Sequence, residues 1–180
     1  ESEWVRVNRG CPQGSNLGPV LWNVYQNDVP LNINKSELMM YADDHQLYVI
    51  GNDIVEIQTT LTADEGKVTT EWYQSNQLQG NPKKYQALCI GSKNDMESNV
   101  KVMNTNIKQS KVIKLLGVQI DSNLDFSDHI RSVCKNAAKK VGILNRRRNM
   151  LSVKAKLKIF KSVILPTLTY CHTVWHHCKA

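Results

Sequence analysis

The residues best suited to chemistry are two adjacent carboxylates, Asp43 and Asp44, which lie between two apolar runs. The runs at 38–41 and 46–50 read as two strands of a β-hairpin with the acidic pair at its tip. Adjacent carboxylates repel each other and lose solvation beside apolar strands, and a bound hard cation removes both penalties. Mg²⁺ takes oxygen ligands and leaves positions for substrate phosphates, so two such ions can clamp a phosphoryl transfer. The pair therefore indicates either a magnesium site or an ordinary acidic turn.

A second chemical feature is the basic charge of the last third of the chain. Residues 1–128 contain 11 Lys+Arg and all 16 Asp+Glu, whereas residues 129–180 contain 12 Lys+Arg and no acid. Such a segment neutralises phosphates, with nucleic acid as the usual partner, although a solvated basic face is the alternative. The triplet Arg146, Arg147 and Arg148 fits a nucleic-acid patch, a nuclear-localisation signal or a solvated helix end.

Length and composition bound the remaining possibilities. The chain has 180 residues and 41% hydrophobic content, which predicts one globular domain or one with a small appendage. No signal peptide opens the chain and no apolar run is long enough to span a bilayer, so we expect no membrane association. Five scattered cysteines indicate a reducing compartment, so we expect an intracellular protein of the nucleus, the cytoplasm or both. Because the first residue is not Met, a piece of a longer protein is also expected.

Hydrophobic spacing predicts the elements that must position these residues. Apolar residues recur with helical spacing after the turn at 10–14, after the capping residue Asp53, and again from Ser127 and Ser152. The helix after Asp53 is expected to end at Gly80-Asn81-Pro82. Strands are predicted at 4–7, 38–41, 46–50, 84–90, 100–102 and 113–120. These elements together predict an α+β fold. Both the charge and the hydrophobic period of the sequence change near 121–127, where we place a boundary between two subdomains.

Several motifs accompany the acidic pair in a fixed order. They are Gly10-Cys-Pro-Gln-Gly-Ser-Asn-Leu-Gly-Pro19, Tyr41-Ala-Asp-Asp44, Asn81-Pro-Lys-Lys84, Leu115-Leu-Gly-Val-Gln-Ile120, His129-Ile130 and Pro166-Thr-Leu-Thr-Tyr170 with Trp175. Taken together, they make the chain resemble the reverse transcriptases of non-LTR (jockey-like, LINE-type) retrotransposons. The resemblance covers nearly all 180 residues.

The resemblance implies a fold, an activity and partners. The fold would be part of a polymerase palm over residues 1–121, an antiparallel sheet with packed helices, followed by a small basic helical thumb over 122–180. The activity would be RNA-directed DNA polymerisation at a primer 3′ end by two-metal transfer with Mg²⁺, or with Mn²⁺. An RNA template, a DNA primer and dNTPs would be the partners. The alternatives are a non-catalytic basic nucleic-acid-binding remnant of a mobile element and a domain that kept only the fold.

The resemblance also implies roles for individual residues. Asp43 and Asp44 match the catalytic metal ligands, and Lys84 matches a lysine near the pyrophosphate leaving group. Tyr41 matches the aromatic position beside the primer end. The turn residues Gln13 and Gly14 match the nucleotide and template pocket. The primer grip is matched by Leu115, Leu116 and Gly117. The basic helices would track the nucleic-acid backbone, and their candidate residues are Lys139, Lys140, Arg146, Arg147 and Arg148.

Two departures from the family pattern matter. The family carries another aspartate on a strand well before the Pro-Gln-Gly turn, and only twelve residues, none of them Asp, precede Gln13 here. We therefore expect this chain to be inactive alone and to need the missing N-terminal part of the same polymerase. His45 replaces the small hydroxyl residue usual after the acidic pair.

A cluster of possible zinc ligands lies outside the motifs, near the C-terminal end: Cys171, His172, His176, His177 and Cys178. Simple helix packing is the favoured interpretation of this cluster, and a zinc site is the less favoured alternative.

Overall fold

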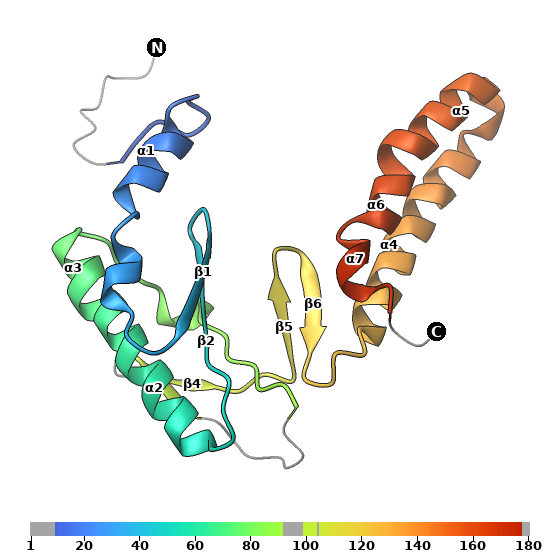
Figure 1. The fold of residues 1–180 in the computed structure, drawn as a ribbon. Coiled ribbons are helices and arrows are strands. Elements are labelled where there is room, and N and C mark those ends of the chain that lie inside the picture. The colour runs from blue at the N-terminus through green and yellow to red at the C-terminus, as the bar shows by residue number, and fades with distance from the viewer. Residues whose placement is uncertain (1–9, 92–98, 104, 178–180) are drawn as a thin grey trace. The chain divides into compact units, whose positions relative to one another are not determined.

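The structure, a computed structural model, describes residues 10–91, 99–103 and 105–177 (Figure 1). The predicted strand at 4–7 and Cys178 lie outside these residues. The chain divides into two compact units. The first unit holds the chain up to Tyr85 together with the hairpin between Asn99 and Lys108. The second unit holds the rest of the chain from Gln86 onward.

The first unit combines helices with two small antiparallel hairpins. One hairpin pairs β1 with β2, and the other pairs β3 with β4. The strand β4 was not predicted, because its sequence, Thr-Asn-Ile-Lys, shows only one apolar residue. The elements are α1 (Gly18–Tyr25), the 3₁₀ turn η1 (Val29–Asn32), β1 (Glu37–Tyr41), β2 (Asp44–Tyr48), α2 (Ile54–Gly66), the π-helical turn η2 (Lys67–Trp72), α3 (Tyr73–Ser75), the 3₁₀ turn η3 (Pro82–Lys84), β3 (Asn99–Val102) and β4 (Thr105–Lys108).

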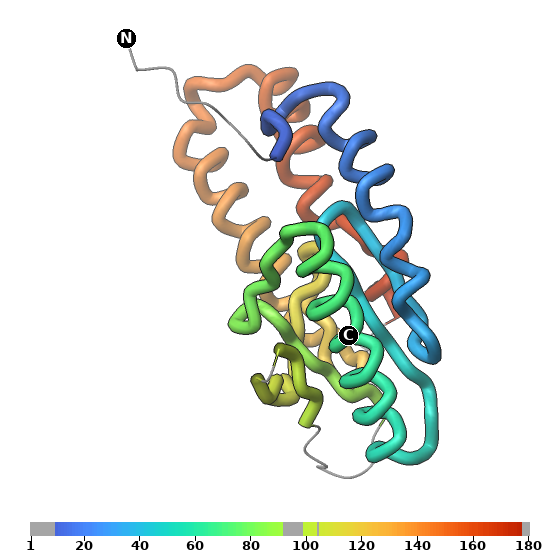
Figure 2. Tube along the Cα trace, turned by 90° about the vertical axis from the view of Figure 1, so that its left-hand side faces the viewer, coloured from blue at the N-terminus to red at the C-terminus, as the bar shows by residue number. Residues whose placement is uncertain are grey.

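The core of the first unit forms where one long helix, made of α2, η2 and α3, packs on the β1–β2 hairpin (Figure 2). Val29, Val68 and Trp72 are buried there, and alternate residues of β1, Leu38 and Met40, pack against them. The Trp72 indole N–H donates to Asp28 Oδ1 at 2.7 Å, which satisfies the polar atom of this large side chain. The core fixes the hairpin on the helix.

The long helix begins as predicted and ends earlier than predicted. Asp53 caps it by accepting the N–H of Val55 at 2.9 Å, and α2, η2 and α3 then follow one another without a break. The helix stops at Ser75 and not at residues 80–82. Gln77 takes a left-handed conformation (φ 56°), and the Leu78 N–H donates to the Tyr73 carbonyl, which is a Schellman ending without the usual glycine.

The predicted strand at 84–90 is wrong. Pro82–Lys84 form the turn η3, and the segment after it makes one isolated bridge, between Ala87 and Gln109. A single bridge leaves most backbone groups of the segment unpaired, and so no ladder forms. The apolar residues of this segment therefore did not decide its backbone pairing.

The second unit consists of a hairpin and a helical module. The predicted single strand at 113–120 is two strands, because Leu116 (φ 45°) and Gly117 (φ 87°) form a tight turn between them. Two successive left-handed residues are what a two-residue β-hairpin turn requires. The elements are β5 (Val112–Leu115), β6 (Val118–Asp121), α4 (Ser127–Arg146), the 3₁₀ turn η4 (Arg148–Met150), α5 (Val153–Ile159), the π-helical turn η5 (Phe160–Ile164), α6 (Leu165–Thr169) and α7 (His172–Trp175).

The two predicted C-terminal helices are confirmed. α4 begins at Ser127, and Ser152 caps α5 by accepting the Ala155 N–H at 3.3 Å. The second helix continues through η5 into α6 and lies beside α4 (Figures 1 and 2). Ala137 and Ile164 are buried in this unit.

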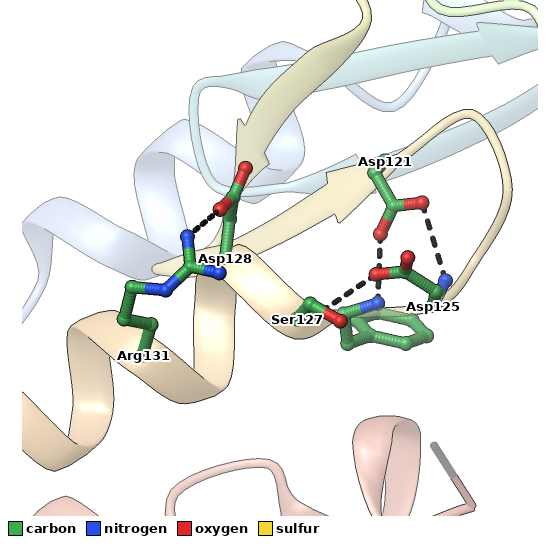
Figure 3. Close-up of polar contacts among 6 residues, drawn as sticks. Asp121, Asp125, Ser127, Asp128 and Arg131 are labelled. Atoms are coloured by element: carbon green, nitrogen blue, oxygen red, sulfur yellow. Dashed lines mark hydrogen bonds and ion pairs between the residues drawn. The ribbon is translucent and has the colours of Figure 1, made fainter. Parts of the chain in front are cut away.

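The junction between β6 and α4 is held by Asp121 (Figure 3). Its carboxylate accepts backbone N–H groups from Asn123, Asp125 and Phe126 at 2.8–3.2 Å. Burial alone would raise the pKa of Asp121, but these hydrogen bonds stabilise the carboxylate and lower its pKa. Asp125 in turn accepts the Ser127 N–H at 2.7 Å, so the change of period seen in the sequence is a hydrogen-bonded corner.

The α+β class holds for the chain, as mixed helices and small antiparallel sheets. The compact units divide at Tyr85 and Lys108, and hairpin β5–β6 belongs with the C-terminal helices. The functional division into residues 1–121 and 122–180 stays a prediction.

Candidate catalytic hairpin and nucleic-acid surface

The β1–β2 hairpin brings Tyr41, Asp43 and Asp44 together. Tyr41 pairs with Asp44 in the strand register, which leaves Ala42 and Asp43 as a two-residue loop. Ala42 has a left-handed φ of 54°, so the loop turns sharply. All three predicted site residues are exposed at this end of the hairpin. The arrangement presents two carboxylates and one aromatic ring to solvent.

His45, directly after the acidic pair, connects the β1–β2 hairpin to neighbouring helices. Its Nε2 lies 3.2 Å from Gln26 Oε1 at the end of α1, and its Nδ1 lies 3.4 Å from the Tyr73 hydroxyl. Gln26 is itself buried. Burial lowers the pKa of His45, while the charges of Asp43 and Asp44 oppose that shift. His45 is therefore a half-buried link between the hairpin and two helices.

Next to His45 lies a half-buried polar cluster that sequence reasoning missed. Tyr73 hydrogen-bonds to Tyr85, and Tyr85 hydrogen-bonds to Glu65. Burial raises the pKa of Glu65 to about 7, and burial together with the Glu65 charge raises the pKa of Tyr85. Gly80 makes room for the ring pair, because a Cβ there would lie 2.8 Å from the Tyr85 hydroxyl oxygen. No periodic pattern marks these residues.

Lys84, Gln13 and Gly14 lie on turns. Lys84 is the last residue of η3 and directly precedes Tyr85, and Asn81 caps that turn by accepting the Lys83 N–H at 3.1 Å. Gly14 has a φ of 82°, a conformation that favours glycine, and its surroundings are open. Gln13 is exposed beside it. The roles of these three residues toward nucleotide and template stay predictions.

The acidic pair suits a divalent cation in the type of its donors. Carboxylate oxygens are the ligands that Mg²⁺ and Mn²⁺ prefer, and both carboxylates are accessible. Within residues 10–91, 99–103 and 105–177, no group of three or more His, Cys, Asp or Glu side chains gathers around a common point. The pair can thus hold a metal with substrate oxygens and water, and a two-metal clamp needs a further carboxylate.

The basic residues predicted to contact nucleic acid divide into two kinds. Lys139 is exposed on α4, whereas the Lys140 ammonium donates to Thr167 Oγ1 and lies 3.4 Å from the Val163 carbonyl oxygen. Arg146, Arg147 and Arg148 are exposed where α4 ends and η4 begins.

The exposed face of α4 also includes two basic residues that the sequence analysis did not single out. Arg131 and Lys135 precede Lys139 at intervals of four residues, so the three share one face of the helix. Arg131 pairs with Asp128 at 2.6 Å (Figure 3), an exposed contact within the first turn of the helix. The helical spacing from Lys139 back to Arg131 was a signal that could have found them.

The three residues predicted to form the primer grip occupy the β5–β6 hairpin. Leu115 ends β5, and Leu116 and Gly117 form the turn. At the C-terminal Cys/His cluster, His172 and His176 have ring centroids 6.3 Å apart, and the described part of the chain forms no three-ligand group there. Among the described residues, no helix combines the length and apolarity needed to cross a bilayer.

Comparison with known families identifies the family of this chain. The family of reverse transcriptases (RNA-dependent DNA polymerases) matches residues 1–120, two thirds of the chain. This chain belongs to the reverse transcriptase family, and the resemblance drawn from the motifs is confirmed.

The relatives are polymerases of retrotransposable elements. The chain is 26% identical, over 93% of its length, to a retrovirus-related Pol polyprotein from type-1 retrotransposable element R1 2 of Nasonia vitripennis. It is 27% identical over 91% of its length to the RNA-directed DNA polymerase from mobile element jockey of Drosophila melanogaster, and 28% identical over 94% to the probable RNA-directed DNA polymerase from transposon X-element of the same species. It spans 43% of the first relative and 19% of each of the other two. No solved structure matches the chain significantly.

Proposed function

We propose that this chain is the catalytic-hairpin and thumb portion of a retrotransposon reverse transcriptase, which adds nucleotides to a primer 3′ end on an RNA template. The observation that carries the proposal is the hairpin that exposes Asp43 and Asp44 at one end, in a chain of the reverse transcriptase family. The residues 1–121 would form the palm portion and 122–180 the thumb. The protein would act inside the cell, in the nucleus, the cytoplasm or both.

The proposed chemistry is a phosphoryl transfer to the primer 3′ hydroxyl. Asp43 and Asp44 would hold Mg²⁺, or Mn²⁺, which when bound stabilises the charge that develops on the reacting oxygens. Lys84 would carry its positive charge toward the pyrophosphate leaving group of the incoming dNTP, and Tyr41 would support the primer end. Gln13 and Gly14 would line the nucleotide and template pocket. His45 would hold the hairpin through Gln26 and Tyr73 and so keep the two carboxylates in place.

The missing N-terminal part of the same polymerase would complete the site. Two carboxylates cannot surround two metal ions, and the relatives are two to five times longer than the matched segment. A second observation supports this partner. Val20, Leu21 and Val24 of α1, together with the preceding Leu17, form an apolar face whose side chains are 56–71% exposed in the described part of the chain. Exposed apolar surface of this kind favours association.

The decisive experiment is a chimera in which this chain replaces the matching segment of the jockey polymerase. We expect primer extension on an RNA template with Mg²⁺, and Asp43→Asn should lower it more than about 100-fold, because even indirect support of a metal commonly contributes 10–100-fold. Asp53→Asn is the matched control, since Asn caps the helix as well as Asp does.

The isolated chain should not extend a primer. Robust extension by the isolated chain that Asp43→Asn abolishes would refute the need for an N-terminal part. A chimera that binds template-primer but never extends it, although the jockey parent does, would favour the alternative function of a non-catalytic basic nucleic-acid-binding remnant. The charge of residues 129–180 is the observation that favours that alternative.

A further inference from the structure

The turn at Leu116-Gly117 is clamped by a side chain from the far end of the chain. The Tyr170 hydroxyl, at the end of α6, donates to the Leu116 carbonyl oxygen at 2.7 Å. The Tyr170 ring covers Gly117 so closely that a Cβ on Gly117 would lie 3.3 Å from the ring atom Cε1. Gly117 is therefore required twice, by its φ of 87° and by the contact with the ring. The two residues are 53 positions apart in the sequence and belong to the same compact unit.

The clamp continues from Tyr170 through Trp175 and His129 to the strand β6 of the same hairpin. The Trp175 indole N–H donates to the Tyr170 carbonyl oxygen at 3.0 Å. The Trp175 and His129 rings pack edge to face, with their centroids 5.6 Å apart. His129, buried at the start of α4, accepts the Gln119 N–H of β6 at Nδ1, 3.3 Å away. Burial lowers the pKa of His129, which suits a neutral ring that accepts at Nδ1.

The contacts form a closed circuit. The circuit runs from the hairpin turn through Tyr170 and Trp175 to His129, and from His129 into the strand β6 that leads back to the turn. A hairpin of two four-residue strands is only marginally stable by itself, so its orientation depends on such external contacts. Here both the turn and the strand beyond it are fixed to the basic helices.

We propose that Tyr170 is a positioning residue that locks the Leu116-Gly117 turn to the basic helical module, so that primer contact and backbone contact occur on one rigid body. This inference rests on the proposed function, in which the turn contacts the primer and α4 tracks the duplex. Its consequence is that recognition of a primer end depends on the Tyr170 hydroxyl, which donates to the Leu116 carbonyl oxygen of the turn.

The first test uses the intact chain without nucleic acid. Amide hydrogen exchange of residues 115–118 should accelerate about two- to tenfold in Tyr170→Phe, the range that one hydrogen bond supplies, while α4 keeps its protection. Gly117→Ala should have a larger effect at the same amides, because it also displaces the ring. Tyr48→Phe removes a tyrosine hydroxyl from the first unit and serves as the matched control. Unchanged exchange at 115–118 in Tyr170→Phe would overturn the lock.

The second test measures binding to two nucleic-acid probes of equal length and charge. One is an RNA–DNA duplex with a recessed primer 3′ end, and the other has both ends closed by loops. Tyr170→Phe should reduce the preference for the recessed end about two- to tenfold and leave affinity for the closed duplex unchanged. An equal loss on both probes, or an unchanged preference, would overturn the positioning role. If the wild-type chain binds neither probe, the nucleic-acid role in the proposed function fails, and the exchange experiment still decides whether the lock exists.

Discussion

The two compact units of this chain differ in charge and in the way they use polar groups. The first unit contains 8 Lys+Arg and 11 Asp+Glu, whereas the second contains 15 and 5. The first unit places its acidic pair on a short hairpin, and His45 supports that hairpin through its contacts with Gln26 and Tyr73. The second unit exposes its charge along the 20-residue helix α4, and contacts of Tyr170 and His129 fix the β5–β6 hairpin to its helices. The first arrangement suits chemistry at one point, and the second suits a long polyanion.

The largest effects on stability should come from the two separate cores. Trp72→Ala should destabilise the first unit by about 3–5 kcal/mol, and Ile164→Ala should destabilise the second by about 2–5 kcal/mol. Hydrogen exchange with mass spectrometry should show lost protection confined to the unit that carries the change. The exposed substitutions Ile50→Ala and Val153→Ala are the controls and should stay within about 0.5 kcal/mol. Joint loss of protection in both units would contradict the division.

The half-buried Glu65 should make the first unit weaken as the pH rises. Its pKa is raised to about 7 in the folded chain from 4.5, so between these values the folded state binds more protons than the unfolded state. Stability from this group is thus complete below pH 4.5 and is lost as the pH rises through 7, by about 3 kcal/mol. His45, whose pKa is lowered, acts in the opposite direction below pH 6.5.

Comparing Glu65→Gln with the parent isolates this contribution. Urea unfolding of both proteins between pH 4.5 and 8 should show the parent falling relative to the variant across that range. Glu71→Gln removes an exposed carboxylate from the same helix and is the matched control. A constant difference between parent and Glu65→Gln at every pH would show that Glu65 ionises normally.

The arginine triplet should supply a large share of the nucleic-acid affinity of the second unit. Replacing Arg146, Arg147 and Arg148 with Ala should reduce the slope of log K against log salt by about 2–3, because each lost phosphate contact removes about 0.7–0.9. The loss should be alike for unrelated sequences, since phosphate contacts carry little sequence information. Titration of a labelled template-primer at several salt concentrations measures it. A triple variant with the parent slope would leave the triplet as a solvated face or a localisation signal.

The smallest effect separates two neighbouring lysines. Lys139→Ala should lower the salt slope by about 0.9, whereas Lys140→Ala should leave it nearly unchanged because the Lys140 ammonium already binds Thr167 and Val163. The same titration applies, and each variant serves as the control of the other. Equal slopes for the two variants would show that Lys140 leaves its internal partners when nucleic acid binds.

The sequence by itself determined those features that depend on local chemistry. Asp53 and Ser152 are caps because their side chains reach N–H groups two and three residues away, and α4 follows from a helical period that runs from Ile130 to Leu144. Family membership was also readable from the sequence, because ordered motifs such as Pro-Gln-Gly and Tyr-Ala-Asp-Asp lie along the chain itself. Each of these signals involves residues near one another in the chain.

Only the tertiary structure decided which residues meet across long separations. A strand was predicted at 84–90, but a strand needs a partner, and that segment makes a single bridge. The link from His45 to Gln26 and Tyr73 spans 19 and 28 residues, and the contact of Tyr170 with the turn spans 54. Lys139 and Lys140 are identical in type and adjacent in sequence, yet only the packing of α6 on α4 gives Lys140 an internal partner. Such contacts carry no local period, because they are set by where packed helices and hairpins bring the chain together.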